Sequence, residues 1–413
     1  TIFMKKNINL YLLNYLIILF FFAVFFLFQK HHVANDSTIS EWLINYEGGF
    51  TKRGLVGQIS FYIAKLFSGD LRDTIFSFQI LTVGTYFLLI YYFLKNIEVN
   101  KVLIFSIFTP IFLLYPIAEI EVLARKELFI FIYLLVYTFI PIHKHNHKFF
   151  YKLIFFPITI LVWEPVVFFI LFLFFIDLVE NKIDRINKIF FIQASAYIPS
   201  IIISFYIALN PISNENHELM ANSLLKNFNE SCYMSCELLK SKSSIYQQFE
   251  GNFGRYSFVI LFRYFLIFLV GFGPLFLLLL NTKFKNKILF FKNFKNLFFP
   301  FLILLSPITV LFAMGYDWGR WINISYFFSF VTFIYLNKNN MINISLKFLE
   351  KDIFKKINRK IFIFLVIFYC FGWNPKTVMT GDVASFPGYR IPYKTLKIIL
   401  KESPTSYFRN FIN

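Results

Sequence analysis

Charged residues are scarce in this sequence. They make up 15% of its 413 residues, while 58% are hydrophobic and 22% aromatic. Soluble globular domains carry roughly a quarter charged residues. A soluble chain of this composition would lack the polar surface needed to cover its core, whereas a lipid bilayer accepts apolar side chains and requires only that backbone groups pair internally. The scarcity of charge therefore excludes a soluble protein and predicts an all-α, polytopic bundle of transmembrane helices.

Cysteine is nearly absent, with three in the chain. Cys370 lies within an apolar run, while Cys232 and Cys236 lie four residues apart in a polar segment. This usage excludes a metal-binding or multi-disulfide framework, but it permits one disulfide if the polar segment faces an oxidising compartment. Internal repeats are also missing, and no broken helices match between the two halves, which argues against a transporter built from repeats.

Acidic residues are outnumbered by basic ones, 23 to 41, which gives a net charge of +18. A balance this basic suggests either nucleic acid or a membrane surface, and the placement of the charges decides between them. Apolar runs of about 20 residues predict membrane spans. The predicted spans are 10–28, 74–94, 102–118, 128–142, 189–209, 257–280, 297–315, 322–336 and 361–373.

The apolar segment 149–179 is too long for one helix. It is interrupted by Trp163-Glu164-Pro165, where proline removes a backbone donor and disfavours helix before it. Both flanking loops are basic, so both ends are expected on the same side of the membrane. We therefore predict a hairpin with Glu164 near its outer tip, which brings the expected total to eleven helices.

Short cytoplasmic loops of membrane proteins are rich in Lys and Arg. Alternating the predicted spans puts six segments on that side: 4–9, 95–101, 143–152, 180–188, 282–296 and 337–360. They hold 22 Lys and Arg against 5 Asp and Glu. The basic excess is thus predicted to face anionic lipid of the inner leaflet, and nucleic acid has no support as a partner. We expect a bacterial inner-membrane protein with a cytoplasmic N-terminus and a periplasmic C-terminus.

The expected transmembrane module covers residues 1–373, with long external segments at 29–73 and 210–256, and an external C-terminal segment follows at 374–413. The first external segment carries Asp36, Glu41 and Glu47, then Gly48-Gly49 and Lys52-Arg53. Glycine lets the backbone approach a ligand closely, and adjacent Lys and Arg suit phosphate oxygens. The segment 55–67 is predicted to be a helix in the outer interface. Its alternative is a short hydrophobic packing helix, and the alternative for the charged residues before it is an interfacial loop with helix-capping acids and snorkelling cations.

Two further charged clusters lie at predicted outer ends of spans. The first contains Glu119, Glu121, Arg125, Lys126 and Glu127, and the second contains Asp317 and Arg320, of which Arg320 lies between two tryptophans. A helical conformation of the first cluster puts Glu121 and Arg125 on one face. Both clusters, together with Glu164, suit an anionic substrate; structural ion pairs and an interfacial tryptophan belt are the alternatives.

This layout resembles the GT-C superfamily of membrane glycosyltransferases across most of the chain. The shared features are an inside N-terminus, a long acidic first external loop with an interfacial helix, roughly a dozen spans and an external C-terminal part. The resemblance implies a polyprenyl-phosphate sugar donor, a glycan or lipid acceptor, and a catalytic base among Asp36, Glu41 and Glu47. The adjacent acidic pair common in that superfamily is absent here.

The same layout also resembles surface-polysaccharide polymerases or ligases that act on lipid-pyrophosphate-linked glycans. In that case the external arginines Arg53, Arg125 and Arg320 would dominate the site and no carboxylate base would be required. In the first case Lys52, Lys126 and Asp317 are expected to join these arginines in binding the donor phosphate, with Glu119, Glu121 and Glu164 in auxiliary roles. The outward acids also suit a divalent cation, which no residue pattern fixes. A transporter or flippase ranks third.

Overall fold

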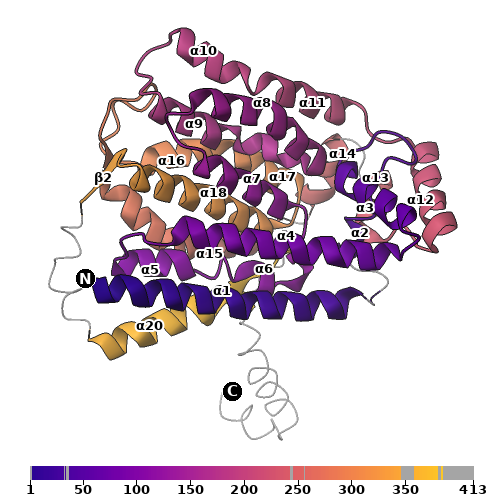
Figure 1. Cartoon of the computed structure of the whole chain (residues 1–413), viewed down its shortest axis with the longest axis horizontal. Helices are drawn as coiled ribbons and strands as arrows, with labels where there is room; N and C mark the ends of the chain where they lie inside the picture. The colour runs from indigo at the N-terminus through magenta and orange to yellow at the C-terminus, as the bar shows by residue number, and fades with distance from the viewer. Residues whose placement is uncertain are drawn as a thin grey trace, which may run out of the picture.

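The computed structural model describes residues 2–31, 33, 37–241, 245–254, 256–345, 358–379 and 383–384. Helices make up 72% of the structure and strands 2%, which confirms the all-α prediction. The longer helices run side by side along the long axis of the molecule (Figure 1). Because each helix satisfies its backbone groups internally, this is the arrangement that an apolar chain can adopt in lipid.

The first half of the chain forms a series of helices with short connections. These are α1 (Ile2–His31), α2 (Ser37–Ser40), α3 (Gly54–Leu66), α4 (Leu71–Leu94), α5 (Lys101–Phe108), α6 (Tyr115–Ala118), η1 (Ile120–Val122), α7 (Glu127–Phe139), α8 (His145–Val162), η2 (Glu164–Phe169), α9 (Ile170–Glu180), α10 (Lys188–Ser195) and α11 (Ile198–Leu209).

The described part of the second half contains further helices and four very short strands. These are α12 (Asn214–Phe228), α13 (Met234–Ser241), α14 (Ile245–Phe253), α15 (Phe258–Leu280), β1 (Thr282–Phe284), α16 (Phe298–Leu305), η3 (Ser306–Ile308), α17 (Thr309–Met314), α18 (Trp318–Lys338), β2 (Ile342–Ile344), α20 (Arg359–Phe371), β3 (Asn374–Pro375) and β4 (Val383–Ala384). Of the predicted C-terminal segment 374–413, the structure describes only 374–379 and 383–384.

Three of the described helices are long and apolar enough to cross a membrane: 9–31, 71–94 and 258–280. The pair α10 and α11, bent by 41°, passes the same test together, and shorter apolar helices lie at 127–139, 298–314 and 360–371. Large apolar side chains such as Phe21 and Phe258 are exposed on the outer helices, as expected for surfaces that face lipid. These features indicate a membrane protein, while the predicted total of eleven spans stays a prediction.

The predicted break in the segment 149–179 is present in the structure. Helix α8 ends at Val162, and a 3-10 turn begins at Glu164 with Pro165 in its first turn. By contrast, the prediction of one continuous helix over 102–118 is wrong, because α5 ends at Phe108 and α6 covers only four residues. Pro110 and Pro116 account for this interruption, since proline lacks the N–H that a continuous helix needs.

Segments predicted to be cytoplasmic meet at one end of the molecule. Strands β1 and β2, from two of these segments, pair antiparallel. The Leu289 N–H donates to the Ile183 carbonyl at 2.8 Å, and Asn9 donates to Asn96 at 2.9 Å. The helices α2, α3, α12, α13 and α14 lie at the other end (Figure 1). The described parts of several predicted inside segments therefore lie at one end, and helices of the predicted outside segments lie at the other.

Helix α18 is the centre of the bundle. Every residue from Trp318 to Leu336 is buried, and α7, α9 and α15 pack around it. Ring stacking anchors this packing, with Phe327 lying 3.9 Å from Phe131 and Phe328 lying 4.4 Å from Phe169 between ring centroids. Because α18 begins where α2 and α3 lie, its first turn brings charged residues to that end of the core.

Candidate functional site

The segment around Glu41 is held firmly against the bundle. The Gln79 side chain donates to the Thr38 carbonyl at 2.9 Å, and the Trp42 indole donates to the Ala124 carbonyl at 2.9 Å. Helix α3 packs closely from the other side, because a Cβ on Gly57 would lie 1.9 Å from the Ile44 carbonyl oxygen. Glycine is required at this close approach. These contacts bury Glu41 completely.

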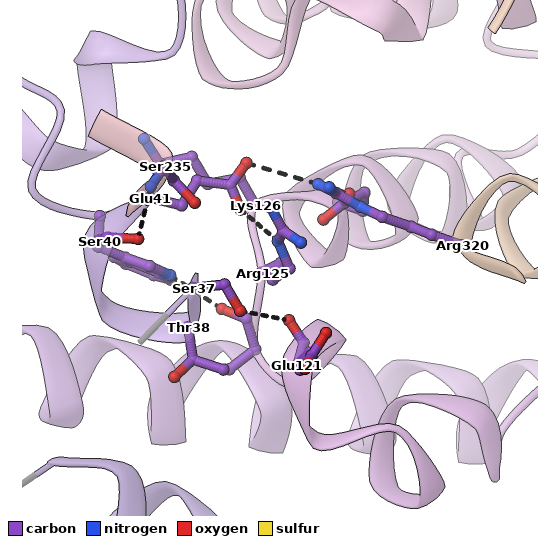
Figure 2. Close-up of polar contacts among 12 residues, drawn as sticks. Ser37, Thr38, Ser40, Glu41, Glu121, Arg125, Lys126, Ser235 and Arg320 are labelled. Carbon is purple, nitrogen blue, oxygen red and sulfur yellow. Dashed lines mark hydrogen bonds and ion pairs between the residues drawn. The ribbon is translucent and has the colours of Figure 1, made fainter. Parts of the chain in front are cut away.

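Glu41 is bound by three arginines from distant parts of the chain. Its Oε2 accepts from Arg125 Nε at 2.8 Å, and its Oε1 lies 3.3 Å from Arg53 Nη1 and 3.4 Å from Arg320 Nη2. Figure 2 shows Glu41 reaching between Arg125 and Arg320. A fully buried carboxylate is stable only when paired. Glu41 therefore fixes the positions of the three guanidinium groups.

Two strained backbone positions help to present these arginines. Arg53, with φ of 63°, and Ala124, with φ of 51°, both adopt the left-handed conformation, which is costly for residues other than glycine and persists where the surrounding structure demands it. The Lys126 ammonium donates to the Arg53 carbonyl. Glu164 accepts two hydrogen bonds from Arg53, at 2.8 and 2.9 Å. The resulting fork-to-fork pair fixes Arg53 in orientation.

A cavity of about 420 Å³ opens beside this cluster. Its charged wall is formed by Lys52, Arg53, Arg125, Glu164, Asp317 and Arg320. Most of the remaining wall is apolar, including Phe168, Ile207, Leu238, Phe249, Leu311 and Trp321. A cavity with a cationic wall and an apolar wall suits a ligand that combines an anionic group with a hydrocarbon chain.

The environment shifts the protonation of several of these groups. Burial alone would raise the pKa of Glu41, but Arg125, Arg320 and Arg53 together hold it well below its usual value. Burial raises the pKa of Asp317, although Arg125 opposes the shift. Burial also lowers the pKa of Lys52 and, against the attraction of Glu41, lowers the pKa of Lys126 to about 7. Glu41 is thus a persistent anion, and Asp317 accepts a proton more readily.

The predicted site residues fall into three groups in the structure. Six line the cavity: Lys52, Arg53, Arg125, Glu164, Asp317 and Arg320. Glu41 and Lys126 lie buried behind its charged wall, and they contact the arginines directly or through the Arg53 carbonyl. Glu47, Glu119 and Glu121 do not line it, and Asp36 is outside the described residues.

The three carboxylates outside the cavity have other contacts. Glu47 accepts from the Gln58 side chain at 2.7 Å, and Glu119 accepts from Asn374 at 3.2 Å. The backbone carbonyl of Glu121 accepts from Ser37 at 3.3 Å (Figure 2). The predicted Gly48-Gly49 approach to a ligand is also replaced by packing, because a Cβ on Gly48 would lie 1.8 Å from the Asn216 carbonyl oxygen.

The prediction that Glu121 and Arg125 share one helical face is wrong. The helix around Glu121 is a three-residue 3-10 turn that ends at Val122, and Arg125 instead pairs with Glu41. Glu127, the last residue of the same charged cluster, was not among the predicted site residues, yet it forms an ion pair with Arg320. The dense charge at 119–127 in an apolar chain indicates that some of these residues belong to a site. Only the three-dimensional structure shows which of them face Arg320.

Two clusters among the described residues have the composition of a metal site. One contains His217, Cys232 and Cys236, and the other contains His31, Asp70 and Asp73. In the first cluster, Cys232 and Cys236 form a disulfide, as the sequence permitted. None of these residues lines the cavity. The expectation of a divalent cation bound by the predicted site residues thus stays a prediction.

Comparison with known proteins adds no relationship, since no protein-family model, curated protein or solved structure matches this chain.

Proposed function

We propose that this protein is a membrane glycosyltransferase that transfers a sugar from a polyprenyl-phosphate donor to a glycan or lipid acceptor. The observation that carries the proposal is the cavity in which three arginines, held in place by Glu41, face an apolar wall. In the proposed orientation this end of the bundle faces the periplasm, across a bacterial inner membrane.

The charged wall suits the phosphate of such a donor. Arginine presents a planar fork that matches phosphate oxygens, and Arg53, Arg125 and Arg320 are already oriented by carboxylates. Lys52 adds a fourth basic side chain to this wall, and the charge of Glu164 favours its protonated form. Cations fixed before the reaction stabilise the charge that develops on a departing phosphate without reorganising.

The rest of the cavity suits the other parts of the donor. Its apolar wall, with Phe168, Leu238 and Phe249, can cover the first isoprene units of a polyprenyl chain. Trp321 offers an aromatic face for a sugar ring, and Asn210 and Gln248 offer hydrogen-bonding groups. Acceptor and donor would then meet in one cavity.

A second candidate is a surface-polysaccharide polymerase or ligase that acts on lipid-pyrophosphate-linked glycans. It is favoured by the saturation of Glu41, whose two oxygens are both occupied by arginines. A carboxylate held in this way is a poor base, so a mechanism that depends on arginines alone fits this part of the site. A transporter or flippase gains no support from the cavity.

Profiling lipid-linked glycans in a deletion strain tests the proposal. Loss of the protein should make a sugar-bearing polyprenyl phosphate accumulate, and one sugar should disappear from a glycan or lipid acceptor. Accumulation of a polyprenyl pyrophosphate-linked oligosaccharide would favour the polymerase or ligase. An unchanged profile, with the wild-type gene expressed in the parent strain, would rule out both.

A further inference from the structure

Two of the described carboxylates line the cavity, Glu164 and Asp317. Glu164 has both oxygens occupied, since Arg53 Nη2 donates to Oε1 at 2.9 Å and Arg53 Nε donates to Oε2 at 2.8 Å. Glu41 lies behind the wall with its oxygens occupied by arginines. Neither glutamate is available to receive a proton from a substrate.

Asp317 differs from both glutamates. Arg320 Nη1 donates to its Oδ2 at 3.2 Å, and among the described residues Oδ1 has no hydrogen-bond partner. Its side chain is 28% exposed, against 20% for Glu164 and none for Glu41. It also caps no helix N–H, although it precedes α18 directly. One carboxylate oxygen is therefore open to the cavity, while the other is held in a fixed direction.

We propose that Asp317 is the base of the reaction, the group that removes the proton from the acceptor hydroxyl. This inference rests on the proposed glycosyltransferase function and deepens it. It assigns the role to the segment before α18 rather than to the first external segment, where the GT-C resemblance would put it.

The step balances as a single displacement. The acceptor oxygen forms a bond to the anomeric carbon while its proton passes to Asp317 Oδ1. The bond between the anomeric carbon and the phosphate oxygen breaks, and its electron pair leaves with the polyprenyl phosphate. Arg53, Arg125 and Arg320 stabilise the charge on that phosphate. Asp317 then releases its proton to water, and the anomeric centre is inverted.

The surroundings of Asp317 fit this role. Burial raises the pKa of its carboxyl, and the charge of Glu41 adds to the shift, while Arg125 and Arg53 oppose it. A base works best when its pKa lies nearer the working pH than that of an ordinary carboxylate. The arginines oppose the rise, which favours the ionised carboxylate that this role requires.

The test compares Asp317→Asn, Asp317→Ser and Asp317→Glu with the wild-type chain in the deletion strain, using the glycan profile as readout. Asp73→Asn is the matched control, because Asp73 pairs with His31 at 2.8 Å and its side chain is 71% exposed. Binding of undecaprenyl phosphate to each purified full-length chain is measured in parallel. A monodisperse peak in size-exclusion chromatography establishes that each variant is folded.

We expect Asp317→Asn and Asp317→Ser to bind undecaprenyl phosphate within about twofold of the wild type but to lose transfer by about 100-fold or more, the usual contribution of a general base. Asp317→Glu, which keeps the carboxylate, should recover part of the transfer. Transfer by Asp317→Asn or Asp317→Ser within threefold of wild type would overturn the assignment, and so would a loss of binding as large as the loss of transfer. If deletion of the whole chain leaves the glycan profile unchanged, the proposed function itself fails.

Discussion

Glu41 combines complete burial with a position just outside the cavity. Its charge is shared among Arg53, Arg125 and Arg320, so it acts on a ligand through the arginines that it holds. Removing one partner from a buried ion network is costly because the remaining charges stay desolvated and repel one another. Glu41 is therefore a positioning residue, and both the stability and the binding of anions depend on it.

The substitution Glu41→Gln should destabilise the protein by about 3–5 kcal/mol. The physical reason is the loss of the anion shared by three arginines. Thermal unfolding of the detergent-solubilised chain, followed by fluorescence-detected size exclusion, measures the effect. Glu218→Gln is the matched control, since Glu218 forms an exposed pair with Lys240 that contributes little. Equal melting temperatures for the two variants would contradict the role assigned to Glu41.

Lys126 should make anion binding depend on pH. Burial lowers the pKa of Lys126 to about 7, so its positive charge is present below pH 7 and is lost as the pH rises through 7. Binding of undecaprenyl phosphate to the wild type, relative to Lys126→Met, should therefore weaken between pH 6 and 8 by a factor on the order of three to ten. The ligand's own ionisation affects both chains equally, so it does not change the ratio of their affinities. A ratio of wild-type to Lys126→Met affinity that stays constant with pH would exclude a role for the Lys126 charge.

Charged residues in an apolar sequence were sufficient to predict six of the cavity-lining residues, including Arg53, Asp317 and Arg320. The choice between Glu41 and Glu47 was not predictable. The chain between them is irregular, so no periodicity indicates which way each side chain points. Glu41 turns into the bundle because its neighbours are held in place. Gln79 of α4 binds the Thr38 carbonyl, and the Trp42 indole binds the Ala124 carbonyl in the segment before α7.

At the scale of elements, the segment that carries the disulfide covers part of the cavity. Cys232 and Cys236 are joined, and Ser235 between them donates its N–H to Ser40 at 3.1 Å (Figure 2). Ser40 precedes Glu41, while Ser235, Leu238 and Leu239 line the cavity. The hydrogen bond thus ties α13 to the segment that organises the arginines, and the disulfide fixes the turn in which Ser235 lies.

Replacing both cysteines by serine should lower stability by about 2 kcal/mol, the value expected for closing so short a loop. Reduction should lower the melting temperature of the wild type by the same amount and leave the double-serine variant unchanged. Thiol counting by mass spectrometry before and after reduction checks the state of the disulfide. A melting temperature that is insensitive to reduction would show that α13 is held by its other contacts.

Two buried ion pairs connect α8, α9 and α18 at a distance from the cavity. Lys152 lies 2.5 Å from Asp177, and Lys148 lies 2.5 Å from Glu180 and donates to Tyr335 at 2.6 Å. Both lysines fall in the segment 143–152, which the sequence predicts to be cytoplasmic. Helix α8 begins at His145, so that the basic residues lie along its buried face.

Asp177→Asn should destabilise the protein by about 3–5 kcal/mol, because it leaves Lys152 buried and unpaired. The double variant Lys152→Met, Asp177→Leu should recover most of that loss, since an apolar pair needs no compensating charge. Melting temperatures of the two variants decide the matter. Equal loss in both would show that the hydrogen bonds of Asp177 with Tyr137 and Tyr197 matter more than the ion pair.

For the whole molecule, composition predicted a helical membrane protein because few other structures tolerate so little charge. The number of spans was less predictable. Apolar runs do not show where a helix is cut by Thr109-Pro110, or where α10 and α11 bend by 41°. Two segments that charge placement predicts to lie on one side do meet in the structure, since strands β1 and β2 pair.

Cysteine labelling in whole cells tests which end faces outward. Leu219, 58% exposed on α12, and Phe290, 62% exposed in the segment that follows β1, belong to opposite ends of the molecule (Figure 1). We expect a membrane-impermeant maleimide to label Leu219→Cys in intact cells and Phe290→Cys only after permeabilisation. The native cysteines interfere little, because two form the disulfide and Cys370 is buried. Labelling of both variants in intact cells would contradict the orientation.

The arginine cluster also has a consequence for biosynthesis. Glu41 is translated long before Arg320, yet the two end as partners separated by 279 positions in the chain. Until α18 has been inserted, Glu41 of the nascent chain lacks its partner Arg320, and the interior of the helix bundle is incomplete. A product truncated before residue 320 is therefore expected to remain incompletely folded and to be recognised by quality-control proteases, so that only full-length chains accumulate.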